Sequence, residues 1–156
     1  MSGPKPVKKK RRDAGEPRRQ YAALPWRLKD GPEILLLTSR DTRRWVIPKG
    51  WPMKGRKPFA TAALEALQEA GLLGKIDRKP LGAYHYRKRL KNGAALFCRV
   101  DVFALRVTRQ RRNWPEKNQR TTQWFSYEAA AEEVAEEELQ TLIRDYGAAL
   151  ASIQNA

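Results

Sequence analysis

One helical segment, residues 58–70, lies in a chain that otherwise consists mainly of strand-like runs. A proline suits the first turn of this segment, alanines and leucines fill it, and Gly71 is placed to end it in a left-handed conformation. On both sides, short apolar runs alternate with turn signals, such as the Asn-Gly step at 92–93, that are typical of β-hairpins. Because hairpins dominate, this order favours an α/β sandwich of the α+β type over a doubly wound parallel sheet.

The same signals predict the remaining elements. Ser126 is a candidate N-cap for a short helical segment, and an amphipathic helix follows it. The sheet should therefore be mixed and rich in hairpins, with two of the three helical segments at the C-terminus. We expect strands at 21–26, 34–38, 45–47, 81–90, 94–108 and 124–125, and the last helix at 136–153.

The length and charge of the chain limit its class. A chain of 156 residues suits one domain, and we place a disordered basic tail at residues 1–19 and the folded domain at 20–156. With 32 Lys and Arg against 17 Asp and Glu, the formal charge of +15 should attract polyanions. One cysteine and one histidine exclude a disulfide framework and a Cys/His metal cluster. We see neither a membrane-spanning run nor a secretory signal, which predicts a cytoplasmic protein.

The loop and helix at residues 50–72 have the spacing of a known motif. They resemble the Nudix box, G-x5-E-x7-R-E-U-x-E-E-x-G-U, in which U is an apolar residue. The matching residues are Gly50, Glu65, Ala66, Glu69, Gly71 and Leu72, and the departures are Arg56 and Gln68 at glutamate positions and Leu64 at the arginine position. The preceding strand and the hairpins on both sides agree with the order of elements in that family.

The resemblance implies a Nudix hydrolase with an α/β/α sandwich and a mixed sheet. Its expected reaction is cleavage of a phosphoanhydride bond in a polyphosphorylated small molecule that is nucleoside or inositol diphosphate-linked, with Mg²⁺ as cofactor or Mn²⁺ in its place. Residues 44–51, 84–89 and 124–125 look closest to the branch that acts on diphosphoinositol polyphosphates and dinucleoside polyphosphates. The resemblance assigns Glu65 and Glu69 as metal ligands, with either one acting as the base.

The chemistry of this helix follows from residue spacing. Glu65 and Glu69 are four residues apart, Gln68 is three from Glu65, and all three project from one face. Paired carboxylates repel unless a cation lies between them, and Mg²⁺ prefers such hard oxygen ligands. Gln68 is the third candidate ligand, but its amide has no charge. The alternative is that both glutamates form a solvated stripe opposite a buried side made of Phe59, Ala63, Ala66, Leu67 and Ala70.

The departures from the motif predict weakened activity. A glutamine cannot act as a base, so Gln68 should lower Mg²⁺ affinity. The family's loop glutamate pairs with the arginine at the start of the helix, and the joint change to Arg56 and Leu64 costs less than losing one partner. We expect the fold to survive, with Arg56 directed to substrate phosphate or to Glu65.

Basic residues near the motif are candidate phosphate ligands, because the planar guanidinium of arginine binds two phosphate oxygens at once. On the strand at 81–90, two arginines share one face and Lys88 takes the other. The candidate substrate-binding residues are Arg44, Lys49, Gly50, Lys54, Arg56, Arg87 and Arg89.

Two rival functions remain open from the sequence. One is a catalytically degenerate Nudix protein that binds a phosphorylated ligand, which Arg56, Leu64 and Gln68 favour. The other is a nucleic-acid-associated protein that uses the basic tail, since each cation placed at a phosphate releases condensed counterions.

Overall fold

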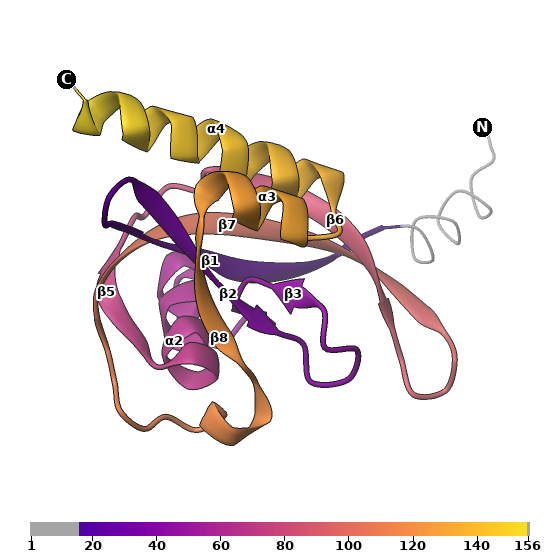
Figure 1. The fold of residues 1–156 in the computed structure, drawn as a ribbon. Helices are drawn as coiled ribbons and strands as arrows, with labels where there is room; N and C mark the ends of the chain where they lie inside the picture. Colours follow the sequence, from indigo (N-terminus) through magenta and orange to yellow (C-terminus); the bar gives the residue numbers. More distant parts are fainter. Residues whose placement is uncertain (1–15, 156) are drawn as a thin grey trace.

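The structure, a computed structural model that describes residues 16–155, is built on a mixed sheet of eight strands (Figure 1). The strands are β1 (Arg18–Leu28), β2 (Pro32–Thr38), β3 (Trp45–Val46), β4 (Lys49–Gly50), β5 (Leu72–Ile76), β6 (Gly82–Arg89), β7 (Ala95–Gln110) and β8 (Thr122–Ser126). The helices are α2 (Pro58–Ala70), α3 (Tyr127–Glu133) and α4 (Glu137–Gln154), with a 3-10 turn, η1 (Lys117–Gln119).

The long strands β1 and β7 organise the sheet. They pair in parallel along their lengths, from Arg18 opposite Cys98 to Trp26 opposite Arg106. The other pairings are antiparallel, including the predicted β1–β2 and β6–β7 hairpins. The mixed, hairpin-rich sheet that we predicted is therefore confirmed.

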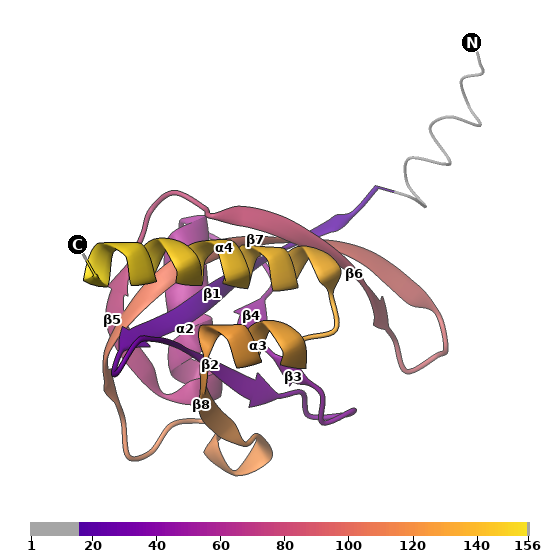
Figure 2. The same cartoon turned by 45° about the horizontal axis from the view of Figure 1, so that its top comes forward.

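Helices cover both faces of the sheet, and this confirms the α/β/α sandwich (Figures 1 and 2). On one face α2 packs its alanines against Ala23 and Phe103. On the other face α3 and α4 pack against Leu24 and Val102. No helix within residues 16–155 is long and apolar enough to cross a membrane.

The ends of the helices confirm two local predictions. Gly71 ends α2 with a φ of 72°, in the left-handed region that favours glycine. Ser126 caps α3 by accepting a hydrogen bond from the N–H of Ala129.

Two predictions at the strands need correction. β5 follows Gly71 directly and was missed, because it has no regular alternation and pairs with β7 through an irregular register between Leu73 and Gly74. β1 begins at Arg18, so Arg18 and Arg19 lie in the sheet and not in the tail. The rest of the predicted tail up to residue 15 lies outside the described residues.

Candidate active site

The short strand β4 and helix α2 meet at Gly50 and Glu65. Gly50 is buried and pairs with Tyr21 of β1, which fixes the backbone beside the helix. A Cβ atom on residue 50 would lie 2.0 Å from Oε2 of Glu65. A glycine is therefore required for the Glu65 carboxylate to lie against β4, which explains the first residue of the motif in steric terms.

Glu69 is a buried acid, with only 6% of its surface exposed, and its carboxyl group shares a hydrogen bond with Glu65. Loss of solvent raises the pKa of Glu69 to about 8, against the opposing effects of Arg120 and Lys49. Burial also raises the pKa of Glu65. Both acids are therefore harder to ionise than a glutamate in solvent.

This burial overturns the solvated-stripe alternative for α2. The fully buried side of the helix is turned relative to the predicted one, so that it includes Glu69, while Phe59, Ala63 and Leu67 are only partly buried. Apolar residues occur on two sides of the helix, and periodicity alone could not identify the side that faces the sheet. The residues that are fully buried are Thr61, Ala62, Ala66, Glu69 and Ala70.

Two cations face the paired acids. Nη2 of Arg120 lies 3.9 Å from Oε2 of Glu69, and only 11% of the Arg120 side chain is exposed. The same guanidinium donates from Nε to Glu116 at 2.7 Å and from Nη1 to the carbonyl of Thr38 at 3.2 Å. On the β4 side, desolvation lowers the pKa of the Lys49 ammonium, while Glu69 opposes that shift.

The segment from 114 to 120 closes the C-terminal end of α2. Nε1 of Trp114 donates to the carbonyl of Glu69 at 3.1 Å, and the N–H of Glu116 donates to the carbonyl of Gln68 at 3.1 Å. The indole ring of Trp114 fills the space beside Gly71, where a Cβ would lie 2.3 Å from its Cε3. Sequence reasoning missed these residues because only the fold brings this segment to the helix.

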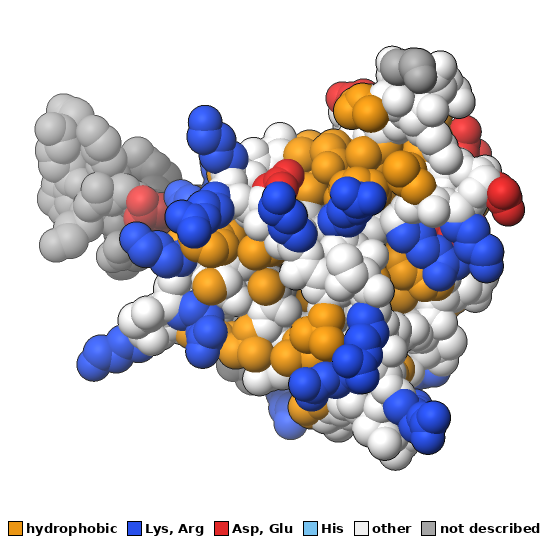
Figure 3. Space-filling view, turned by 90° about the vertical axis from the view of Figure 1, so that its left-hand side faces the viewer, with side chains coloured by type: hydrophobic (Ala, Val, Ile, Leu, Met, Phe, Trp, Pro, Cys, Tyr) orange, Lys and Arg blue, Asp and Glu red, His pale blue; other side chains and the backbone are white. Residues whose placement is uncertain are grey.

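Two predicted basic residues, Lys54 and Arg56, lie in the loop between β4 and α2 and form no ion pair with Glu65 or Glu69 among the described residues. Arg56 lines an apolar groove of about 340 Å³ with Phe59 and Leu64, and no ion pair joins it to Glu65 within residues 16–155. Figure 3 shows the β5 side of the molecule, where apolar side chains are surrounded by Lys and Arg. Lys54 is exposed in the same loop. The expected Arg56–Glu65 contact is therefore absent, and contact of Arg56 with substrate stays a prediction.

Glu136, at the start of α4, adds a carboxylate on the Lys49 side of the site. It lies 3.5 Å from Nη1 of Arg44 and is 13% exposed, and it contributes to the electrostatic surroundings of Lys49. The buried hydroxyl of Tyr84 is affected by the same groups, and its pKa is raised well above the ordinary value, first by desolvation and then by Glu136. Arg44 therefore lies at the edge of the site beside Glu136, and its contact with substrate stays a prediction.

The side chains of β6 divide between the two faces of the sheet, and substrate binding by Arg87 and Arg89 stays a prediction. Nζ of Lys49 lies 5.1 Å from the centre of the Tyr86 ring, and Lys88 also affects the pKa of Lys49. Because side chains alternate along a strand, Arg87 and Arg89 project from the opposite face. Lys88, and not the two predicted arginines, is therefore the cation of β6 on the Lys49 side.

The donor set suits a hard divalent cation. Glu65 and Glu69 offer carboxylate oxygens at one place, and Mg²⁺ usually binds one or two carboxylates, with waters and substrate phosphates as its other ligands. Within residues 16–155 there is no group of three or more His, Cys, Asp or Glu side chains that could hold a metal. The predicted third ligand, Gln68, is half-buried beside the pair.

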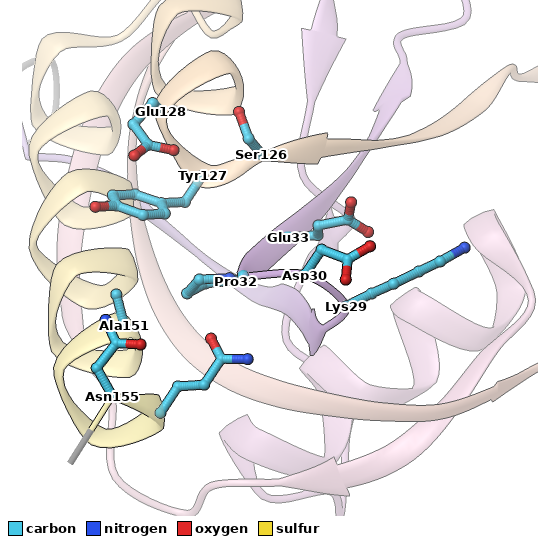
Figure 4. Close-up of a pocket in the computed structure, with 11 residues that line it drawn as sticks. Lys29, Asp30, Pro32, Glu33, Ser126, Tyr127, Glu128, Ala151 and Asn155 are labelled. Carbon is cyan, nitrogen blue, oxygen red and sulfur yellow. The ribbon is translucent and has the colours of Figure 1, made fainter.

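A separate cavity of about 690 Å³ lies at the other end of the α3–α4 layer (Figure 4). The β1–β2 turn and the end of α4 form its walls, and Lys29, Glu33 and Glu128 are among its polar side chains. None of the predicted site residues lines it.

Comparison with known proteins gives relatives and solved structures that are hydrolases of phosphorylated compounds or Nudix hydrolases by name. The chain is 31% identical over 116 residues to diphosphoinositol polyphosphate phosphohydrolase 3-alpha of Mus musculus, covering 72% of this chain and 66% of that protein. It is 28% identical over 117 residues to Nudix hydrolase 12, mitochondrial, of Arabidopsis thaliana, covering 73% of this chain and 58% of that protein. The chain thus spans about three fifths of the length of the first curated relatives that it matches.

The fold also matches solved structures. A binary complex of the C. elegans Ap4A hydrolase superposes with a TM-score of 0.64 and 21% identity, over 86% of this chain and 98% of that one. A NUDIX hydrolase from Nitrosomonas europaea gives a TM-score of 0.63 at 20% identity, over 87% and 92% of the two chains. No protein-family model matches the chain.

Proposed function

This chain belongs to the Nudix hydrolase family, and we propose that it hydrolyses a phosphoanhydride bond in a polyphosphorylated small molecule, nucleoside or inositol diphosphate-linked. The observation that carries this proposal is the hydrogen-bonded pair of acids, Glu65 and Glu69, of which Glu69 is buried and both have a raised pKa. Burial of an acid beside a second carboxylate is costly, and acids with such shifted pKa values cluster at functional sites.

Glu65 and Glu69 would hold Mg²⁺, or Mn²⁺ in its place, with Gln68 as a neutral third ligand. Bound there, the ion would neutralise charge on the bridging and leaving oxygens and lower the pKa of an attacking water. Either Glu65 or Glu69 would act as the base and accept the proton of that water. Water oxygen bonds to one phosphorus, the bridging P–O bond breaks, and its electron pair stays with the departing phosphate.

Basic side chains around the acids orient the polyphosphate. Lys49 lies on the β4 side and Arg44 at the edge, and Lys88 faces the same side from β6. Withdrawal of the Lys49 ammonium from solvent strengthens its attraction for a phosphate oxygen, since the surroundings screen the charge less than bulk water. The relatives that act on diphosphoinositol polyphosphates make such a highly charged substrate the first to test.

The activity is weak in this proposal. Gln68 contributes a neutral oxygen where a glutamate would contribute a charge, so metal binding loses one carboxylate. The alternative, a binder of phosphorylated ligands without turnover, is favoured by the same residue together with Arg56 and Leu64. The predicted cytoplasmic location belongs to this proposal as well, although three of the plant relatives carry the word mitochondrial in their names.

The test is Mg²⁺-dependent release of phosphate from a panel of dinucleoside polyphosphates, nucleoside diphosphate-linked compounds and diphosphoinositol polyphosphates. We expect slow turnover by the native chain, loss of at least about 100-fold in kcat for Glu69→Gln, and a gain in kcat or Mg²⁺ affinity for Gln68→Glu. Glu132→Gln, an exposed acid on α3, is the matched control and should behave as the native chain does.

The outcomes separate the two candidates. Tight binding of a substrate analogue with no turnover in either the native chain or Gln68→Glu supports the binder. Turnover that is equal in the native chain and Glu69→Gln contradicts the proposed site, because the chemistry then lies elsewhere.

A further inference from the structure

The sheet face covered by α2 continues past the helix onto the β6–β7 hairpin. The core on this face ends at Tyr21 and Phe103, whose rings meet edge to face with centres 6.4 Å apart. Beyond them the hairpin extends away from the helical layers, as Figures 1 and 2 both show. The one helix residue that forms an ion pair with this extension is Glu138 of α4, which contacts His85, among the residues that the structure describes.

The strand register gathers basic and aromatic side chains on this extension. Arg87 lies opposite Phe97 and His85 opposite Arg99 in the β6–β7 pair, while Arg19 of β1 lies beside Arg99. Residues directly opposite each other share a face of the sheet. We define the hairpin face as Arg19, His85, Arg87, Arg89, Phe97 and Arg99.

Two of its arginines are held in place by one acid. Nη1 of Arg19 donates to Asp101 at 2.7 Å, and Nε of Arg99 donates to the other oxygen of Asp101 at 3.1 Å. Their side chains are still 54% and 43% exposed, so each keeps N–H groups free for a ligand. The pair is oriented in advance and carries a net positive charge.

The other two arginines are not neutralised. Arg87 and Arg89 are exposed, and within residues 16–155 neither forms an ion pair. The acids that contact the hairpin face are Asp101 and Glu138. Four arginines against two carboxylates leave an excess of positive charge here, on a chain whose formal charge is +15.

An aromatic ring lies among these cations. Phe97 is 37% exposed, which is unusual for a phenylalanine, and its ring stacks on that of His85 with centres 5.5 Å apart and an angle of 15°. Nδ1 of His85 lies 3.1 Å from Oε1 of Glu138, and this contact fixes the imidazole ring on which Phe97 stacks. The hairpin face therefore presents a fixed aromatic surface between guanidinium groups.

We propose that the hairpin face binds single-stranded RNA, with its arginines on phosphates and one base stacked on Phe97. The Phe97 ring with arginines on both sides matches a nucleic-acid strand, in which phosphates and bases alternate. Stacking on the ring would accept any base, because every base has a π-face. Duplexes keep their bases stacked inside, so the occupant is a single strand, and RNA offers single-stranded loops and ends. An acidic peptide would match the charge and leave the ring unused.

The site is separate from the proposed hydrolytic centre. Arg87 and Arg89 project from the face of β6 opposite Tyr86, on whose side Lys49 lies. The hairpin face lies on the α2 side of the sheet, as the paired acids do, but it shares no residue with the acids or with Lys49 and Arg120. Each site can therefore be mutated without changing the residues of the other.

The experiment is fluorescence anisotropy of the full chain with a labelled uridine-rich RNA of about ten nucleotides. This length lies within the range that small single-strand-binding domains cover. Three variants are compared across a salt series: Phe97→Ala, Arg87→Gln/Arg89→Gln, and the matched control Lys75→Gln/Arg109→Gln. The control removes the same charge from exposed positions on β5 and the far end of β7.

We expect Phe97→Ala to raise Kd by at least about fivefold, the lower end of the range for one stacked base. The double arginine variant should reduce the slope of log Kd against log salt by about 1.4, or about 0.7 for each lost phosphate contact. The slope of log Kd against log salt should change less in the control than in the double arginine variant. Thermal unfolding of each variant checks that the protein remains folded.

Three results overturn the proposal: equal loss of affinity in the control and the arginine variant, no effect of Phe97→Ala, or binding of duplex RNA as tight as that of the single strand. The first would assign binding to net charge and the basic tail. The second or third would remove the stacked base and leave binding to phosphates through charge alone.

Discussion

Glu69 combines burial, a hydrogen bond to a second acid and two neighbouring cations at one residue. Its pKa of about 8 in the folded protein lies well above the ordinary 4.5, mainly because of desolvation. A folded pKa above the unfolded one means that folding takes up a proton. The protonated acid therefore stabilises the fold fully below about pH 4.5, and this contribution is lost as pH rises through about 8.

We predict that the free energy of unfolding of the metal-free protein falls by roughly 2–4 kcal/mol between pH 4.5 and 8 because of this acid. Glu69→Gln, which has no proton to lose, should flatten that dependence. Urea unfolding with a chelator present, at several pH values, measures it. Identical pH profiles for the native chain and the variant would contradict the buried, protonated state.

At the scale of elements, the segment from 114 to 120 holds the end of α2. Arg120 links Glu116, Glu69 and the carbonyl of Thr38 while almost buried. Replacing it with methionine leaves Glu116 without its partner in a poorly solvated place, and loss of one member of such a pair is costly.

Arg120→Met should lower the free energy of unfolding at pH 7 by roughly 2–3 kcal/mol, less than for a fully buried pair because Glu116 keeps some solvent. Adding Glu116→Gln should recover part of the loss, as expected of coupled residues. Arg112→Met, an exposed arginine of the preceding loop, is the control. If both arginine variants lose equal stability, the guanidinium of Arg120 has no structural role.

Local signals explain which elements could be predicted. The Pro-to-Gly limits of α2, the Ser126 cap and the Asn-Gly turn act over a few residues, and each was found. β5 was missed because tertiary pairing with β7, and not its own pattern, makes it a strand. The paired acids follow from the spacing of four residues, whereas Arg120 and Glu136 reach the site only through the sheet topology.

At the scale of the whole molecule, the charge should guide substrates. Arg44 lies at the edge of the site with 44% of its side chain exposed, and the formal charge of +15 adds a longer-range attraction for anions. Screening shortens this attraction to about 8 Å at physiological ionic strength.

We therefore predict that kcat/KM for a polyphosphate substrate falls as KCl is raised at constant free Mg²⁺, with kcat much less affected, because steering acts on encounter and not on chemistry. Steady-state kinetics over a salt series measures both parameters. A kcat/KM that stays constant or rises with salt would show that the positive charge has no part in substrate capture.

The central claim is that Glu65 and Glu69 hold a divalent cation at the reacting diphosphate. The most direct measurement is a crystal structure with Mn²⁺ and a non-hydrolysable diphosphate analogue, in which anomalous scattering locates the metal. We expect a peak between the two carboxylates, within about 2.3 Å of an oxygen of each and bridged to a phosphate oxygen. Analogue bound beside Lys49 with no metal at the two acids would contradict it.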